Sequence, residues 1–418
     1  MSIFRKLEKE ELGQLARIAT SAFTAQGLSE KREEELLEFL ESLYSEAKDQ
    51  HIFGVFREGQ LIGGLRMIDF KMFLFSHLIS VGGAAMVCVD LLHKKEKVAK
   101  ELIYGFINYY RAQGVPMVAM YAFKAGFYRK MGFGYGTWIK QHKVKPSAFL
   151  GNGEKKNLVY LDSKDKNAIW NCYNRFAAKR NGLLEKYPPD YHRLFRRKDN
   201  RIVGYRDGEQ LLGYISFTYR REPVNERYMM LDEVVYENSE ALNSLCSFIR
   251  SQADQFEWVL VNTQDEGFQF LFDDLESSSH LRIFANEHAH TPEQVSTTAI
   301  GVMYRVISLP ALFKNLGEYN FNQQNLKLKI TINDTLCPEN SGSIVACFVN
   351  GKVNLSEENS YEVEIELDVA DFSSMFMGAV TFSALEQLGR AKISNVLYLD
   401  TVNRIFLTNQ KPICMTYF

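Results

Sequence analysis

The stretch Val87–Leu102, VCVDLLHKKEKVAKEL, does most to decide the fold. Its first part reads as a buried strand, and the apolar residues from Val98 onward recur at helical spacing. The turn that joins strand to helix is rich in lysine and contains no glycine. Backbone N–H groups at a helix N-terminus attract phosphate, but phosphate-binding turns usually need glycine for close approach of the backbone. The pattern therefore predicts either an altered phosphate site or the solvated start of a helix.

The composition of the whole chain describes a globular protein with several domains. At 418 residues it is too long for one ordinary core, so we expect two or three domains. The net charge of -2 gives no reason to expect nucleic acid or an anionic membrane as a partner. No apolar stretch approaches the roughly 20 residues of a membrane span, and the N-terminal residues have no signal-peptide core. We expect a cytoplasmic protein.

The cysteine and histidine spacings favour neither disulfides nor a metal site. Six scattered cysteines without short paired spacings indicate buried free thiols in a reducing compartment; they are Cys88, Cys172, Cys246, Cys337, Cys347 and Cys414. His288 and His290 are close together, but no second pair of ligands accompanies them, so we expect no metal.

Three regions follow one another along the chain. Residues 1–147 alternate helices with strands of several kinds, which predicts an α/β unit with a mixed sheet. Residues 148–299 repeat a similar order of elements without repeating the residues. Residues 300–418 differ, with strands, a helical segment FSSMFMGAVTFSALEQLG and a last strand KPICMTYF, and predict an α+β domain. We expect an α/β protein, α+β overall, with domain boundaries near 147 and 299.

The opening stretch and the segment Phe123–Gly136, FKAGFYRKMGFGYG, carry a resemblance to a known family. Together with the duplicated α/β order and the third region, they resemble the GNAT acyltransferase superfamily and, more closely, its Eis (enhanced intracellular survival) family. The resemblance spans the whole chain and implies tandem GNAT-like mixed-sheet domains followed by a domain similar to sterol carrier proteins. Only the first GNAT-like domain has a cofactor loop.

The resemblance implies that acetyl-CoA lies between two splayed strands, MVCV and VAMYA. The backbone of Val87, Cys88 and Val89 would then pair with the pantetheine amides as an added strand does. Their side chains can equally be core residues of a buried strand, and the two interpretations are compatible. The turn would hold the pyrophosphate; the expected contacts there are Lys94, Lys95, Glu96, Lys97, Val98, Ala99 and Lys100, with Phe123 as a further contact.

Lys97 stands where family members usually have glycine. If this position needs a left-handed backbone, lysine costs roughly 1–2 kcal/mol relative to glycine. Against this, a lysine 4 Å from a phosphate charge gains up to about 4 kcal/mol before screening and side-chain ordering reduce the gain. Weaker or altered binding is therefore plausible, and loss of binding does not follow.

Tyr128 is the predicted catalytic acid, the role of a tyrosine in this segment of the family. A phenol with a pKa near 10 stays protonated at neutral pH and can stabilise the leaving thiolate. The alternative is that Tyr128 only anchors its short helix by packing. Tyr121 and Tyr135 are interpreted as packing residues.

Phe418 is the predicted source of the catalytic base, because the family uses its C-terminal carboxylate. A carboxyl with a pKa near 3.5 abstracts a proton from an alkylammonium only uphill, by about 9 kcal/mol, unless water bridges them or the amine pKa is lowered. A mobile terminus is the alternative, but the apolar tail favours a packed one.

Acidic residues would hold a cationic acceptor. The run Glu30 to Glu41 is one candidate wall, although such runs are most often solvated helix faces. Glu96 and Glu101 are expected to pair with neighbouring lysines. The second GNAT-like domain is acidic where the first is basic, so we expect it to be structural, and we expect the third domain to position Phe418.

The leading hypothesis is acetyl transfer from acetyl-CoA to a primary amine of an aminoglycoside-like molecule, a polyamine or a lysine peptide. The alternative is a non-catalytic binding protein whose third domain holds an apolar ligand. The resemblance also suggests a ring-like homo-oligomer, such as a hexamer.

Overall fold

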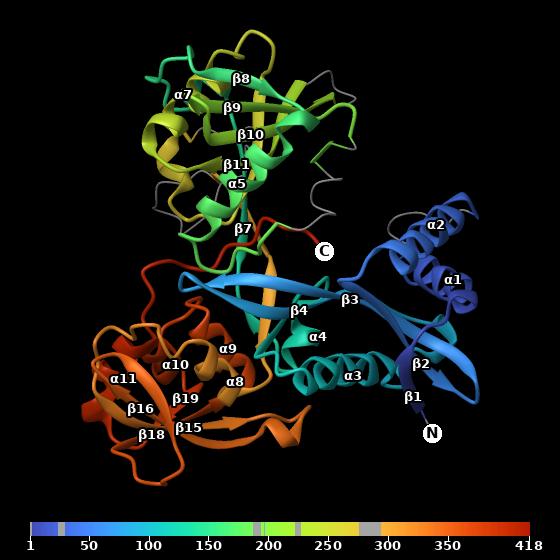
Figure 1. Cartoon of the computed structure of the whole chain (residues 1–418), viewed down its shortest axis with the longest axis vertical. Coiled ribbons are helices and arrows are strands. Elements are labelled where there is room, and N and C mark those ends of the chain that lie inside the picture. Colours follow the sequence, from blue (N-terminus) through green and yellow to red (C-terminus); the bar gives the residue numbers. More distant parts are fainter. Residues whose placement is uncertain (1, 24–29, 187–193, 196, 222–226, 276–293) are drawn as a thin grey trace, which may run out of the picture.

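The computed structural model describes residues 2–23, 30–186, 194–195, 197–221, 227–275 and 294–418. These residues form three lobes, each built around one sheet (Figure 1). The second domain is the upper lobe in this view, and the first and third domains lie side by side below it. His288 and His290 lie outside the described residues.

The first sheet has the strand order β1-β2-β3-β4-β5-β14-β6. Its strands are β1 Ser2–Lys6, β2 Gln50–Arg57, β3 Gln60–Leu74, β4 His77–Val89, β5 Met117–Tyr121, β6 Gly134–Tyr135 and β14 Val302–Val306. The helices of this region are α1 Leu12–Ala22, α2 Glu30–Glu46, α3 Val98–Ala112 and α4 Ala125–Arg129. The apolar face of α3 is buried against the sheet through residues at helical spacing, such as Val98, Leu102 and Phe106.

The hairpin of β3 and β4 turns inside one apolar segment, Met72–Gly83 (MFLFSHLISVGG). Its residues predict a single strand, but a turn at Phe75 and Ser76 divides it, and both residues have positive φ. Each half continues a longer strand, so β3 and β4 form one long hairpin. The periodicity of two is the same on both sides of such a turn and did not reveal it.

The second sheet has the order β13-β7-β12-β11-β10-β9-β8. Its strands are β7 Trp138–Val144, β8 Leu158–Leu161, β9 Arg201–Asp207, β10 Gln210–Arg221, β11 Arg227–Tyr236, β12 Trp258–Thr263 and β13 Thr297–Ile300. Helices α5 Lys166–Ala177 and α7 Ser239–Arg250 cover its two faces and pack in separate cores.

The third domain has the sheet β17-β16-β15-β18-β19. Its strands are β15 Leu326–Asn333, β16 Gly342–Val349, β17 Lys352–Ser356, β18 Val363–Asp368 and β19 Ala391–Ile393, with helices α8 Leu309–Asn315, α9 Val369–Phe376, α10 Phe382–Gln387 and α11 Leu399–Phe406. The predicted helix Phe372–Gly389 is therefore two helices, and the predicted strand Lys411–Phe418 is wrong, because this tail forms no strand.

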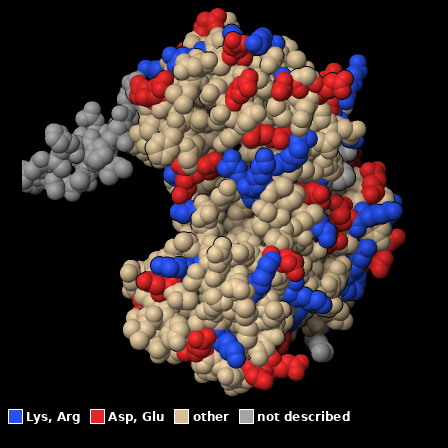
Figure 2. Space-filling model, turned by 60° about the vertical axis from the view of Figure 1, so that its left-hand side comes forward, with Lys and Arg blue, Asp and Glu red and all other residues tan. Residues whose placement is uncertain are grey.

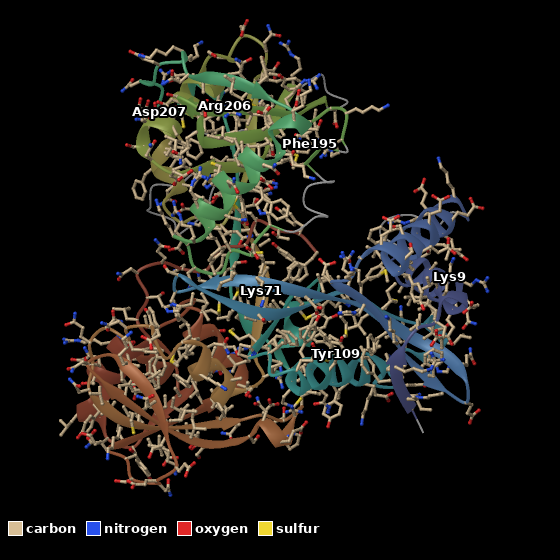
Figure 3. All side chains as sticks on the ribbon, viewed as in Figure 1. Lys9, Lys71, Tyr109, Phe195, Arg206 and Asp207 are labelled. Carbon is tan, nitrogen blue, oxygen red and sulfur yellow. The ribbon has the colours of Figure 1, made fainter. Side chains whose placement is uncertain are left out.

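The sheets exchange strands at the domain junctions. β7 precedes the boundary predicted near 147 yet lies in the second sheet, while β14 follows the boundary predicted near 299 and lies in the first sheet, between β5 and β6. The segment after α5 also bonds to the end of β3: Gly182 N–H donates to Phe73 and Glu185 N–H to Lys71, the residue labelled at this junction in Figure 3. The three domains are therefore joined by backbone hydrogen bonds as well as by side chains.

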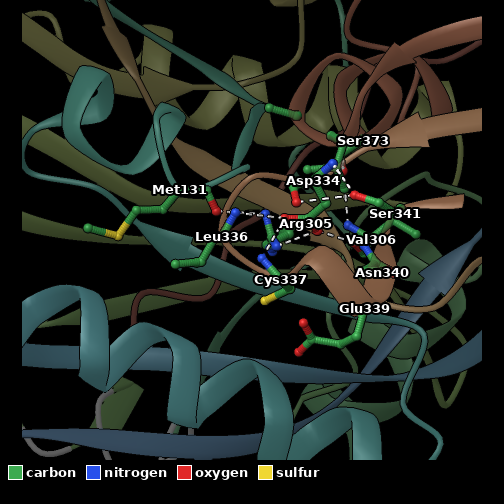
Figure 4. Close-up of polar contacts among 12 residues, drawn as sticks. Met131, Arg305, Val306, Asp334, Leu336, Cys337, Glu339, Asn340, Ser341 and Ser373 are labelled. Carbon is green, nitrogen blue, oxygen red and sulfur yellow. Dashed lines mark hydrogen bonds and ion pairs between the residues drawn. The ribbon is translucent and has the colours of Figure 1, made fainter.

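A buried ion pair fastens the third domain to the first. Arg305 on β14 and Asp334 are both fully buried, with 2.6 Å between Nη2 and Oδ2 (Figure 4). Arg305 also donates to the Met131 carbonyl at 2.6 Å, and Asp334 accepts from the backbone N–H groups of Leu336 and Cys337. The pair thereby ties β14, the loop after β15 and the end of α4 together.

Candidate active site

The site forms where two parallel strands separate. β4 and β5 pair from Val81 with Met117 to Ala84 with Met120, and the pairing ends there. β4 continues past this point on the β3 side, so the backbone of Val87, Cys88 and Val89 has no partner among the described strands on the β5 side. An unpaired strand edge of this kind accepts an extended ligand as a further strand.

A bulge in β4 marks the place where the strands separate. Gly64 of β3 pairs with Cys88 and Arg66 with Ala85, so two residues of β4 lie opposite one residue of β3. Met86 lies in this bulge with φ 51°. Bulges bend a strand and redirect its side chains, and they are frequent beside active sites.

The lysine turn adopts the conformation that glycine would favour. Lys97 is the N-cap of α3 with φ 67° and ψ 11°, and Lys95 has φ 69°, so both are left-handed. No side chain caps the helix. Because the first N–H groups of a helix have no intrahelical acceptor, those of Val98, Ala99 and Lys100 remain available for an anion. The turn therefore reaches, with lysine, the backbone conformation that glycine would favour and presents these N–H groups at the start of the helix.

The carboxylates of this turn do not pair with the lysines, which corrects the expectation for Glu96 and Glu101. Arg57 of β2 bonds both, at 2.6 Å and 2.8 Å, and Glu96 also bonds His93 at 3.0 Å. The hydrogen bond from His93 is the largest cause that lowers the pKa of Glu96. Because both carboxylates bind Arg57, the lysine ammonium groups of the turn are left for other partners. Arg57 is 39 residues from Glu96 in sequence, so no local pattern could have identified it.

Cys88 and Tyr128 are both buried, Cys88 in the apolar cluster under α1 and α2 and Tyr128 in the cluster under α3. Both side chains are 2% exposed, and burial raises the pKa of each to about 12, with the charge of Cys88 contributing at Tyr128. The rings of Phe127 and Phe133 lie edge-on to Tyr128, at 5.1 Å and 6.2 Å between centroids. Phe123, 72% exposed, lies 6.3 Å from the same ring at the surface. Tyr128 is therefore a protonated phenol held by aromatic packing.

The third domain holds the helix that carries Tyr128. Arg129 of α4 bonds to Asp371 of α9, a buried carboxylate that Arg390 also binds at 2.6 Å. The Met131 carbonyl, one turn after Tyr128, accepts from the buried Arg305. The position of the phenol is thus fixed from two sides.

The C-terminus lies against the first sheet, between it and the upper lobe (Figure 1). The ring of Phe418 packs edge-on against Phe70 of β3 at 4.8 Å and Tyr121 of β5 at 5.3 Å. Tyr417 stacks on the same Tyr121 at 5.5 Å. Gly83 of β4 leaves room for this cluster, because a Cβ there would lie 2.4 Å from the Phe70 ring and 3.4 Å from that of Phe418.

Tyr121 has a larger role than the packing predicted for it. Besides its contacts with both terminal rings, its hydroxyl donates to the Cys414 carbonyl at 3.4 Å. It stands at the end of β5, where the strands separate, and so connects the tail to the cofactor strands. Its position as the last residue of the strand was the signal available in the sequence.

A cavity of about 410 Å³ opens beside the bulge. Helices α1 and α2 form its walls, with Met86 on the third side; the lining residues are Ala19, Thr20, Phe23, Arg32, Glu35, Leu36, Phe39 and Met86. Among the acidic side chains of the run that the structure describes, Glu35 is the one that lines it. Two other charges of this helix, Glu33 and Lys31, take part in loose ion pairs of 3.5–3.9 Å on the exposed surface. Most of the run is a solvated helix face.

Charges of both signs lie on the surface that the structure describes. On the face in Figure 2, acidic and basic side chains are interspersed, and a hollow separates the upper lobe from the lower part. Among the helices that the structure describes, none has the length and apolar composition needed to cross a bilayer. All six cysteines are described, and none forms a disulfide.

Family models match all three domains. An acetyltransferase (GNAT) domain model matches residues 4–136, a second acetyltransferase (GNAT) domain model matches residues 182–295, and a sterol carrier protein domain model matches residues 312–415. No curated protein shows significant sequence similarity to the chain.

Solved structures share the complete arrangement. A GCN5-related N-acetyltransferase from Anabaena variabilis superposes with a TM-score of 0.83 at 19% identity, and Eis1 from Mycobacterium abscessus with 0.76 at 18%. A probable N-acyltransferase from Enterococcus faecalis gives 0.80 at 16%. Each match covers 100% of both chains. The chain is therefore a GNAT-type N-acetyltransferase, with two GNAT domains followed by a sterol-carrier-protein domain in the arrangement of the Eis family.

Proposed function

We propose that the protein transfers the acetyl group of acetyl-CoA to a primary amine, with Tyr128 as the acid and the carboxylate of Phe418 as the base. The observation that carries this proposal is the convergence of an unpaired strand edge, a buried phenol and the chain terminus on the end of β5. Acetyl-CoA would bind along Val87–Val89 and over the turn from Lys94 to Lys100.

The amine nitrogen attacks the thioester carbonyl, forming the C–N bond before the C–S bond breaks. The ammonium proton becomes acidic once nitrogen is bonded to the carbonyl carbon, so the weakly basic carboxylate of Phe418 can take it, directly or through water. The amine itself must be neutral to attack, so its first proton is lost to solvent beforehand, at a cost of about 4 kcal/mol at pH 7 for an amine with a pKa near 10. The carboxylate then takes only the second proton, so the roughly 9 kcal/mol transfer from the free alkylammonium to a carboxylate is not required.

The leaving thiolate receives the proton of Tyr128. A free thiol has a pKa of about 8.5, so a phenol raised to about 12 would donate to a solvated thiolate uphill. The transfer becomes less unfavourable when the thiolate leaves into surroundings shielded from water, because loss of solvation raises the pKa of a thiol.

The acceptor would enter through the cavity between α1 and α2, whose lining includes the carboxylate of Glu35 and the guanidinium of Arg32. Aminoglycosides, polyamines and lysine peptides are the acceptor classes we propose, and mass-resolved acetylation screens distinguish them. A ring-like homo-oligomer, such as a hexamer, is part of the same proposal and is tested by mass in solution.

The terminus tests the mechanism most directly. Addition of one glycine after Phe418 moves the carboxylate by about one residue length, 3.3 Å. We expect turnover to fall at least 100-fold while acetyl-CoA still raises the thermal midpoint as in the native chain. Full turnover in the extended chain would remove the carboxylate from the mechanism.

The non-catalytic alternative is tested by ligand-induced stabilisation. A ligand at 100 times its Kd stabilises the folded state by about 2.7 kcal/mol. A shift with a fatty acid and none with acetyl-CoA would favour that alternative for the third domain.

A further inference from the structure

The second GNAT domain contains the same strand separation as the first. β11 and β12 pair in parallel from Tyr228 with Trp258 to Leu231 with Val261, and the pairing then ends. β11 also carries a bulge opposite β10 at this place, because its pairing shifts between Ser216 and Phe217. The second domain therefore has the backbone architecture of a cofactor cleft.

The chain's own C-terminal tail lies in this cleft. Ile413, Cys414, Met415 and Tyr417 line it together with residues of β11 and the end of β12. The space left in this pocket is about 60 Å³, enough for a few water molecules, whereas ligand pockets usually measure 300–1,000 Å³. A second cavity, of about 270 Å³, is lined by Met415 and Tyr417 together with Met230–Glu233 of β11 and Asn262 of β12. The tail therefore occupies space between the separated strands and borders this second cavity.

Gln264 holds the tail at one residue. It directly follows β12, and its side-chain amide makes both hydrogen bonds of a backbone pair: the Cys414 N–H donates to Oε1 at 2.7 Å, and Nε2 donates to the Cys414 carbonyl at 2.6 Å. The same carbonyl accepts from the Tyr121 hydroxyl of the first domain. Cys414 is thus the point at which the tail is bound by both GNAT domains.

Residues on the N-terminal side of Cys414 make further contacts that help to hold the tail. The Ile413 N–H donates to the carbonyl of Asn181, whose buried side chain donates to Met377 of the third domain at 2.9 Å. Lys411 and Glu266 are 2.8 Å apart but half exposed, so this ion pair contributes little.

The register of the tail decides where the carboxylate lies. Cys414 and Phe418 are four residues apart, an extended reach of about 13 Å. A slip of one residue moves the terminus by about 3.3 Å and exchanges the faces of the chain, which would withdraw the Phe418 ring from Phe70 and Tyr121. A base must lie within about 3 Å of its proton.

We propose that the second GNAT domain uses its cofactor cleft to bind the chain's own C-terminal segment, with Gln264 as the positioning residue that sets its register. The positioning half of this inference rests on the proposed role of the Phe418 carboxylate. The binding half does not, because it concerns only the contacts of the tail.

Cys414 provides a native reporter of tail release. It is 2% exposed, as is Cys246 of α7 in the same domain. We expect Gln264→Leu, which keeps the size and removes both hydrogen bonds, to speed alkylation of Cys414 by a maleimide at least tenfold, with the labelled peptide identified by mass. Labelling of Cys246 should not change. Gln264→Glu keeps the acceptor for the Cys414 N–H and should give an intermediate rate, which provides a milder variant if Gln264→Leu folds poorly.

Gln252→Leu is the matched control. Gln252, two residues after the end of α7, donates to the Phe248 carbonyl at 3.3 Å and to the Ser251 hydroxyl at 3.1 Å, and neither bond involves the tail. It should leave both labelling rates at those of the native chain. Unchanged labelling of Cys414 in Gln264→Leu, or equal acceleration at Cys246, overturns the inference.

Steady-state kinetics separate the inference from the proposed function. With both correct, Gln264→Leu lowers kcat about tenfold and leaves the KM for acetyl-CoA unchanged. Faster labelling of Cys414 with unchanged kcat would support tail binding and overturn the role of the carboxylate.

Discussion

The two GNAT domains share a strand separation and differ in what can enter it. In the first, the edge of β4 is unpaired, and α3 begins at a left-handed lysine with no side-chain cap. In the second, the tail occupies the cleft, and the Asn238 side chain caps α7 by accepting from the Ala241 N–H at 2.8 Å. The chain itself thus satisfies in the second domain the groups that the first leaves for a ligand.

This difference shows that the ability of a GNAT domain to bind a ligand depends on a small number of groups beside the cleft. In each domain four pairs of residues join the two parallel strands, and a bulge follows where they separate, so the backbone does not distinguish the clefts. Whether a ligand can enter depends on three other features: a side-chain cap on the helix, the sign of the charges in the turn, and whether the cleft is already occupied. Fold similarity between the halves therefore says nothing about a second cofactor.

The largest expected effect is on stability and concerns the buried ion pair carried by β14, a strand of the first sheet. The first sheet takes β14 from beyond the second domain, and Arg305 on that strand is buried against Asp334. Arg305→Met leaves the buried carboxylate without its partner, so we expect a loss of about 3–5 kcal/mol in chemical denaturation. Lys392→Met removes an exposed pair with Glu366 and should cost under about 0.5 kcal/mol. Equal effects in the two variants would contradict this account of the junction.

The next largest effect is on kcat and concerns Tyr128, the proposed acid in the first GNAT domain. Tyr128→Phe removes only the hydroxyl, so we expect kcat to fall about 100-fold with little change in stability or in the KM for acetyl-CoA. Because burial raises the pKa of Tyr128 to about 12, the phenol stays protonated, and the native pH–rate profile should lack an alkaline limb below roughly pH 10.

Tyr135→Phe is the control for this substitution, since Tyr135 lies in the same segment, beside Trp138. It should retain native kcat. Native activity in Tyr128→Phe would return Tyr128 to a packing role.

The smallest effect tests the lysine turn. Lys97 already has the left-handed conformation, so Lys97→Gly should relieve strain and raise stability by about 1 kcal/mol. Loss of the charge should weaken CoA binding about fivefold, as expected for one exposed ionic contact. Titration calorimetry measures the affinity for CoA and the number of CoA sites per chain. The comparison of the two clefts requires one site per chain.

Glu58→Gly relieves a similar conformation, φ 50°, in the turn between β2 and β3. It should stabilise the chain without changing CoA affinity. Tighter CoA binding in Lys97→Gly would mean that backbone geometry, not charge, limits the site.

Local patterns were sufficient for most of the fold. Periodicity predicted α3 and the repeated α/β order, because these depend on neighbours in sequence. The family models confirm the two GNAT domains and the sterol-carrier-protein domain. The roles of Tyr128 and Phe418 and the domain boundaries stay predictions.

Contacts between distant residues could not be predicted in the same way. The tail looked like a strand because its residues suit one, but a strand needs a partner, and Cys414 finds a side chain instead. Arg57, Gln264 and β14 act through partners 39 or more residues away, and one sequence contains no record of such pairs.

The place of β14 also sets an order for synthesis of the chain. β5 remains an open sheet edge until β14 leaves the ribosome, roughly 10 to 40 s later at usual elongation rates. An open edge recruits other strands and promotes aggregation. The nascent first domain therefore needs protection, by its own transient contacts or by a chaperone, for the time that the second domain takes to be made.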